Sequence, residues 1–167
     1  MTTVLLRVFA LQFAILIGGP VHVAAQSMPV IEMKNLAGQD VRWPSDLPGD
    51  PAVVIIAYKR EQQSDVESWV TELGFGSDGP YAQVLMLGRG AALARGFIDG
   101  GLRSVFDAAA QARTFTLYVA PNTLNGPLGI TSTDDVTVLV VARNGQILTR
   151  QIGAPTAAGL AAVRSAL

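Results

Sequence analysis

The stretch Val136-Thr-Val-Leu-Val-Val-Ala-Arg-Asn-Gly-Gln-Ile-Leu-Thr-Arg-Gln-Ile152 carries the strongest structural signal in the sequence. Its first part, residues 136–142, consists of apolar and β-branched residues, which favours a buried strand. Asn144-Gly145 follows, and an Asn-Gly dipeptide between two strand-forming runs is typical of a tight β-hairpin turn. We therefore predict that residues 136–142 and 146–152 pair as an antiparallel hairpin.

Upstream of this hairpin, strand and helix patterns alternate. The run 52–58 (AVVIIAY) is continuously apolar, which favours a strand buried on both faces of a sheet. Strands that alternate with helices need crossover connections and are therefore partly parallel, whereas the final hairpin is antiparallel. The sequence thus predicts an α/β fold with a mixed central sheet, helices on both faces, and a C-terminal β-hairpin followed by a helix. The other predicted strands are 29–34, 41–43, 81–87 and 114–119. A helix is predicted over 64–73, where Ser64 and Glu67 form a capping box at its start. The remaining predicted helices are a glycine-interrupted segment 93–112, a short helix or turn 121–129, and 156–167.

The composition of the 167-residue chain suits one globular domain. Half of the residues are hydrophobic and the formal net charge is -1, so no basic surface for a nucleic acid is expected. The sequence contains no cysteine and a single histidine, His22. A chain without cysteine has no thiolate nucleophile, disulfide or zinc–thiolate site, and we predict no catalytic residues, no metal and no cofactor.

Residues 1–25 have the layout of a secretory signal peptide. Arg7 precedes the apolar run 8–17, Gly18-Gly19-Pro20 interrupts it, and Val23-Ala24-Ala25 offers the small residues that a signal peptidase reads. We predict a cleaved signal over 1–25, a single domain over 26–167, a periplasmic or secreted location, and no membrane span in the mature chain. The alternative is an uncleaved membrane anchor, for which the apolar run is short of the ~20 residues that span a bilayer.

The order of elements resembles the thioredoxin-like superfamily, and within it the branch of peroxiredoxins and extracytoplasmic thiol oxidoreductases. The resemblance is carried by Asn35–Val41 (NLAGQDV) before the strand 52–58, and by Leu128-Gly129-Ile130 before the final hairpin. It implies a three-layer α/β/α sandwich. In that family a Cys-x-x-Cys pair follows the buried strand and a cis-proline precedes the hairpin. Here the corresponding positions hold Glu61-Gln62-Gln63-Ser64 and the region of Val136, so the resemblance implies the fold without the thiol chemistry.

A narrower resemblance is to the mitochondrial ATP-synthase assembly factor family and its bacterial relatives. It is carried by Tyr58-Lys59-Arg60, Val66–Trp69, Phe97–Arg103 and Arg113–Tyr118. This resemblance implies binding to another protein during assembly, without catalysis.

The predicted binding site lies where the strand 52–58 gives way to the next helix. Ligands of open α/β sheets bind at the carboxyl ends of strands, and the N-terminus of a helix favours anions. Lys59 and Arg60 add positive charge there, and the arginines of the middle segment extend it. The predicted binding residues are Tyr58, Lys59, Arg60, Glu61, Ser64, Arg95 and Arg103, and the spacing also allows Arg95 to pair with Asp99 and Arg103 with Asp107.

These residues predict a non-catalytic binding or assembly module for a protein partner. One alternative is a thiol-independent enzyme or small-anion-binding protein that uses Lys59–Ser64, with Glu61 acting beside Lys59. Another is a protein that docks on thioredoxin-like redox enzymes. Both Trp43 and Trp69 are expected in the core, and for Trp43 the alternative is a partly exposed anchor for a partner.

Overall fold

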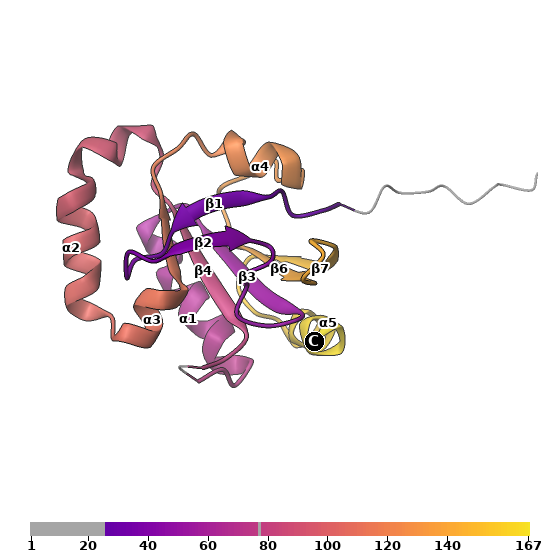
Figure 1. The fold of residues 1–167 in the computed structure, drawn as a ribbon. Helices are drawn as coiled ribbons and strands as arrows, with labels where there is room; N and C mark the ends of the chain where they lie inside the picture. Colours follow the sequence, from indigo (N-terminus) through magenta and orange to yellow (C-terminus); the bar gives the residue numbers. More distant parts are fainter. Residues whose placement is uncertain (1–25, 77) are drawn as a thin grey trace, which may run out of the picture.

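The computed structural model describes residues 26–76 and 78–167, so the predicted signal at 1–25 lies outside the described residues (Figure 1). A five-stranded sheet has the order β5-β4-β3-β6-β7. The central strand β3 pairs in parallel with β4 and antiparallel with β6, β4 pairs in parallel with β5, and β6 and β7 form the antiparallel hairpin. The strands are β3 (Ala52–Ala57), β4 (Tyr81–Met86), β5 (Thr114–Leu117), β6 (Thr137–Val141) and β7 (Ile147–Ile152). The predicted mixed sheet and its C-terminal hairpin are confirmed.

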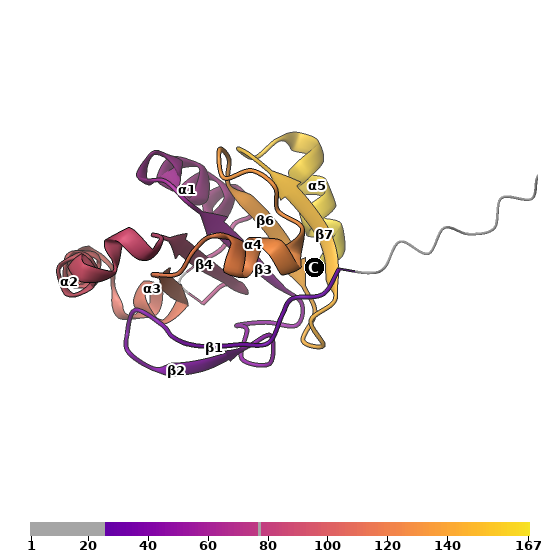
Figure 2. The ribbon, with the colours of Figure 1, turned by 90° about the horizontal axis from the view of Figure 1, so that it is seen from above.

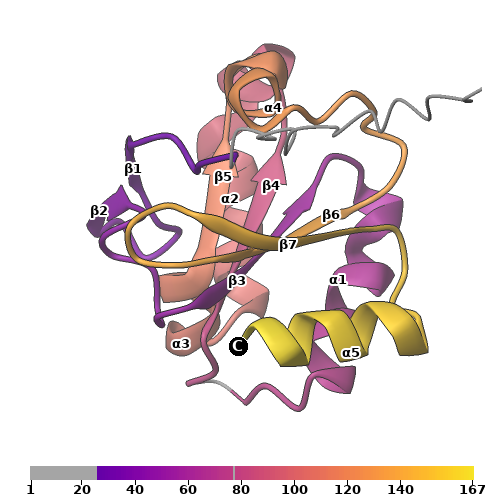
Figure 3. The ribbon, with the colours of Figure 1, turned by 90° about the vertical axis from the view of Figure 1, so that its right-hand side faces the viewer.

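Each face of the sheet is covered by a different set of elements. Helices α1 (Gln63–Glu72) and α5 (Ala157–Ala166) pack on one face (Figures 2 and 3). On the other face lie α4 (Asn122–Leu128) and a separate hairpin of β1 (Ile31–Lys34) with β2 (Asp40–Trp43). Every residue of β3 and β6 is buried because both faces of these central strands are covered.

The two tryptophans are both core residues. Trp69 is 1% exposed and its Nε1 donates a hydrogen bond to the Gly153 carbonyl oxygen at 2.9 Å, as expected for a core position. Trp43 is also in the core as expected, since it is fully buried and its ring lies 4.7 Å from that of Phe115, and the alternative of a partly exposed anchor is wrong. The alternation of side chains along β2 turns Trp43 towards the sheet. Trp43 therefore holds the β1–β2 hairpin in place and is not accessible to a partner.

Two helix boundaries differ from those predicted. A 3-10 turn, η1 (Arg60–Gln62), precedes α1, and Ser64 lies inside the helix with its Oγ donating to the Glu61 carbonyl oxygen at 3.4 Å. The predicted Ser64–Glu67 capping box is therefore wrong, because η1 moves the start of the helical turn towards β3.

The segment after β4 forms a 3-10 helix, η2 (Arg89–Ala94), and the helices α2 (Arg95–Val105) and α3 (Ala108–Arg113). The break falls at Phe106-Asp107, where the Asp107 side chain caps α3, and not at the glycines. Helix α2 stands at the end of the molecule farthest from β7 (Figures 1 and 2). Across residues 26–76 and 78–167, no helix has the length and apolar character needed to cross a membrane.

Candidate functional site

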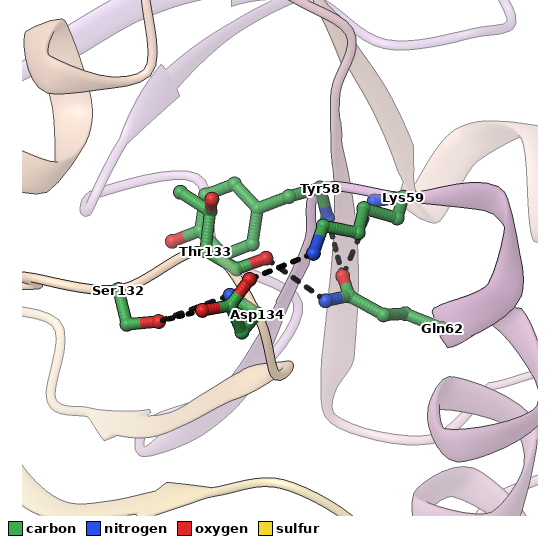
Figure 4. A network of polar contacts seen from close by, with 6 residues as sticks. All are labelled: Tyr58, Lys59, Gln62, Ser132, Thr133 and Asp134. Carbon is green, nitrogen blue, oxygen red and sulfur yellow. Dashed lines mark hydrogen bonds and ion pairs between the residues drawn. The ribbon is translucent and has the colours of Figure 1, made fainter.

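The predicted site begins at the carboxyl end of β3. Because β3 and β6 are antiparallel, with Ile56 opposite Thr137, the end of β3 lies beside the start of β6. The connection from β3 to α1 therefore faces residues 132–134, which lie far away in the sequence (Figure 4).

Gln62 joins these two segments. Its Oε1 accepts hydrogen bonds from the backbone N–H groups of Tyr58 at 2.7 Å and Lys59 at 3.2 Å, and its Nε2 donates to the Thr133 carbonyl oxygen at 3.1 Å (Figure 4). Gln62 is 5% exposed and lies within the four positions that the resemblance aligns with the Cys-x-x-Cys motif. Among the positions aligned with the Cys-x-x-Cys motif, the chain thus has the side-chain amide of Gln62, which is held by hydrogen bonds at both its oxygen and its nitrogen. No local pattern in the sequence indicates this role, because Thr133, which accepts the bond from Gln62 Nε2, lies 71 residues further along.

Lys59 forms an exposed ion pair with Asp134, with 2.8 Å between Nζ and Oδ1. The hydrogen bond and charge of Asp134 raise the pKa of Lys59, and those of Lys59 lower the pKa of Asp134. This pair neutralises Lys59. Arg60 is exposed and has no carboxylate partner in the described part of the chain, so it alone keeps the positive charge expected at this edge.

Tyr58 is tied to the opposite side of the sheet. Its hydroxyl donates to Asn125 Oδ1 on α4 at 2.9 Å, and burial raises its pKa. The hydroxyl therefore anchors the end of β3 and is not free for a partner.

An open groove of about 700 Å³ lies between α1 and α2, and we call it the α1–α2 groove. Tyr58, Lys59 and Arg60 border it. Gln63 and Glu67 of α1 also line it. The rest of its lining is mainly apolar and comes largely from the end of β4 and from α2, with Leu85, Leu87, Ile98, Leu102, Val105 and Phe106 among its residues.

Helix α2 leaves two large apolar side chains exposed to solvent. Its one buried residue is the carboxylate Asp99, whereas Phe97 is 87% exposed and Val105 is 73% exposed. Leu93, in the preceding turn, is fully exposed. A surface helix normally buries its apolar face, and an exposed apolar patch marks an interaction site.

A second groove, of about 640 Å³, lies on the other side of α2, and we call it the α2–β1 groove. Arg95 and Arg103 border it with Asp99 between them. The predicted pair of Arg95 with Asp99 is present, with 4.0 Å between Nε and Oδ2. The suggested pair of Arg103 with Asp107 is absent, because Arg103 Nε donates to the Leu36 carbonyl oxygen at 2.7 Å while Asp107 caps α3.

Asp99 fixes α2 to the end of β5. Its Oδ1 accepts hydrogen bonds from Tyr118 Oη at 2.7 Å and from Thr116 Oγ1 at 2.9 Å. Burial and the bond to Asp99 raise the pKa of Tyr118 to about 12. The guanidinium of Arg95 lies over the Tyr118 ring, 4.7 Å from its centroid. The sequence indicated only the pair of Asp99 with Arg95 and not its hydrogen bonds with Thr116 and Tyr118 at the end of β5.

The structure therefore divides the predicted binding residues. Tyr58, Lys59 and Arg60 border the α1–α2 groove, Arg95 and Arg103 border the α2–β1 groove, and Glu61 and Ser64 border neither. The predicted residues therefore do not line one common groove, because α2 lies between the two sets. In residues 26–76 and 78–167, no three His, Asp or Glu side chains gather as metal ligands would.

Comparison with known proteins gives a fold. No protein-family model and no curated protein matches the chain. The exposed lipoprotein thioredoxin of Streptococcus pneumoniae strain TIGR4 matches with a TM-score of 0.55 and 14% identity, over 83% of this chain and all of that one.

Two further solved structures agree. BsSco, a member of the Sco family of cytochrome c oxidase assembly proteins, matches with a TM-score of 0.56 and 9% identity, over 86% of this chain and 94% of its own. The thio-disulfide isomerase of Thermus thermophilus matches with a TM-score of 0.51 and 15% identity, over 85% and 95%. At such identities the likeness concerns the fold alone. The chain has a thioredoxin-like fold, carried by a sequence without cysteine.

Proposed function

We propose that this chain is an exported, redox-inactive protein that binds a protein partner through the α1–α2 groove. The observation that carries the proposal is the exposed apolar surface of α2, formed by Phe97 and Val105, along this groove. Export rests on the signal-like pattern of residues 1–25.

Thiol chemistry plays no part in this function, since the sequence has no cysteine. Gln62 occupies the corresponding place and closes it with hydrogen bonds to both neighbouring segments. Without thiol chemistry, this edge of the sheet can still serve as a binding surface.

A protein suits the groove better than a small ligand does. A ligand lying within the groove would leave the outer sides of Phe97 and Val105 in water, whereas a protein surface would cover them. Covering a side chain of this size contributes about 1.5–3 kcal/mol. Arg60 at the groove's edge would attract an acidic side chain of the partner.

An assembly role is the narrower form of this proposal. It draws on the resemblance to ATP-synthase assembly factors, and BsSco, which shares the fold, is itself described as one of a family of assembly proteins. The partner would then be a subunit held before it enters its complex.

The test is crosslinking in cells that make the protein, with the full chain tagged and the captured proteins identified by mass spectrometry. Phe97→Ser and Val105→Ser should each reduce capture of the same defined partner about tenfold or more, as for interface residues worth over 1 kcal/mol. Val30→Ser is the matched control, because Val30 is 63% exposed but lies before β1, outside the groove. The proposal fails if no partner is enriched, or if Val105→Ser and Val30→Ser behave alike.

A further inference from the structure

The α2–β1 groove carries an uneven charge. On its β1 side, Lys34 Nζ lies 2.7 Å from Asp40 Oδ1, and Glu32 Oε1 lies 3.9 Å from Arg42 Nε. Within each of these pairs, which join β1 to β2, the positive and the negative charge neutralise each other. The charges that remain on the groove are those of its α2 side.

Arg103 supplies the excess positive charge on that side. It has no carboxylate partner in the described part of the chain, whereas Arg95 lies beside Asp99. The bond from Nε to the Leu36 carbonyl oxygen fixes the guanidinium, and its Nη1 and Nη2 groups make no hydrogen bond to any described residue. A guanidinium with two free terminal amino groups is a donor pair suited to a carboxylate.

Asp99 supplies an acceptor one turn away. Both hydroxyl donors, Tyr118 and Thr116, bind its Oδ1. Its Oδ2 has only the Arg95 Nε at 4.0 Å, which is longer than a hydrogen bond. The side chain is 12% exposed and borders the groove, so Oδ2 is left able to accept a bond from a ligand.

We propose that the α2–β1 groove binds a carboxylate that carries a hydrogen-bond donor on the adjacent carbon. The carboxylate would accept from Arg103 Nη1 and Nη2, and the donor, a hydroxyl, an ammonium or an amide N–H, would reach Asp99 Oδ2. Arg103 and Asp99 are four residues apart on α2 and so stand on one face, about 6 Å apart along the axis. The groove volume of about 640 Å³ suits a small ligand, and Met33, Leu117 and Val119 give it apolar walls.

The site is separate from the proposed partner surface. The α1–α2 and α2–β1 grooves share no bordering residue, because they lie on opposite sides of α2. Failure of either proposal therefore leaves the other standing.

The experiment is isothermal titration calorimetry on the full chain with a matched set of ligands. The probe is 3-phenyllactate, which has the carboxylate and the adjacent hydroxyl. We expect saturable binding, about tenfold weaker binding of 3-phenylpropionate, which lacks the hydroxyl, and no measurable binding of the uncharged 3-phenyllactamide. N-acetylphenylalanine mimics the end of a peptide, and phenylalanine is the free amino acid, so their ranking identifies the natural source of the carboxylate.

Variants place the binding in the groove. Arg103→Gln should weaken 3-phenyllactate binding tenfold or more, and Arg103→Lys, which keeps the charge without the fork, should weaken it less. Arg89→Gln is the control, since Arg89 is an exposed arginine outside this groove, and it should change affinity less than twofold. The comparison of ligands on the unmodified chain stands even if a variant misfolds. The proposal is overturned if no acid binds at millimolar concentration, or if 3-phenyllactate, 3-phenylpropionate and 3-phenyllactamide bind alike. It is also overturned if Arg103→Gln and Arg89→Gln have equal effects.

Discussion

Gln62 is the single residue on which the connection from β3 to α1 depends. Its replacement by alanine leaves the Tyr58 N–H and the Thr133 carbonyl without their partners in a part-buried place. We expect Gln62→Ala to lower the free energy of unfolding by about 2–3 kcal/mol. Gln63→Ala is the control, because Gln63 makes only an exposed bond to Glu67 at 3.3 Å, and should cost under about 0.5 kcal/mol. Urea unfolding measures both, and equal costs would contradict the role given to Gln62.

The ion pair of Lys59 with Asp134 makes a pH prediction. The pKa of Asp134 is lowered below its usual 3.8, so its contribution to stability is present above that pH and is lost as the pH falls through the lowered value. The pKa of Lys59 is raised above its usual 10.5, so its contribution is present below that pH and is lost as the pH rises through the raised value. Carbon-detected NMR titration of Asp134 should show its pKa rising towards 3.8 in Lys59→Gln. An unchanged pKa would mean that the pair does not form in solution.

For single residues, the sequence predicted their place in the fold better than the residues with which they pair. It placed Lys59 and Arg60 correctly after a buried strand, because a continuous apolar run followed by charged residues is a local pattern. It did not predict that Asp134, 75 residues away, neutralises Lys59. Such a pairing depends on the antiparallel placement of β6 beside β3, and no local spacing encodes it.

Helix α2 is weakened by the glycines in its sequence. It contains Gly96, Gly100 and Gly101, each of which costs a helix interior about 0.5–1 kcal/mol relative to alanine. A Cβ added at Gly100 would meet no atom within 4 Å apart from the neighbouring backbone of its own helix, so Gly100→Ala should stabilise the protein by about that amount. Gly145→Ala should instead destabilise it, because φ is +91° there and Ser27 Oγ lies 3.1 Å from the added carbon. Urea unfolding, with hydrogen exchange of the α2 amides, tests both, and a destabilising Gly100→Ala would mean that something packs on that face.

The strands were more predictable than the helix boundaries, for a physical reason. Runs such as 52–57 and 137–141 are apolar at every position because they are covered on both faces, and that signal is local. Helix starts depend on which of several polar side chains finds a backbone partner. Here Gln62 forms a hydrogen bond to Thr133, a tertiary contact, and the helix begins at Gln63. Ser64 therefore does not cap it, although the local sequence fits a capping box.

For the whole molecule, the sequence predicted the order of elements and the mixed sheet but not how surfaces meet. The alternation of strand and helix patterns, together with the hairpin at 136–152, was enough for the fold class. The division of the binding residues was not predictable, because it depends on the place of α2 at one end of the molecule (Figure 2). A groove lies on each side of this helix. In addition, the one buried residue of α2 is the carboxylate Asp99, whereas sequence patterns are interpreted on the assumption that a helix buries its apolar residues.

Truncation of one aromatic residue on each kind of surface tests this architecture. Trp43 is fully buried against Phe115 beneath the β1–β2 hairpin, so Trp43→Ala should lower the free energy of unfolding by about 3–5 kcal/mol. Phe97 is 87% exposed, so Phe97→Ala should change it by no more than about 0.5 kcal/mol. Urea unfolding of the two variants measures the contrast. A large cost for Phe97→Ala would mean that α2 turns its apolar face inwards in solution, which would remove the surface on which the proposed partner binding rests. A small cost for Trp43→Ala would mean that the hairpin does not close that face of the sheet, and the α2–β1 groove, which needs β1 as its wall, would then lose its shape.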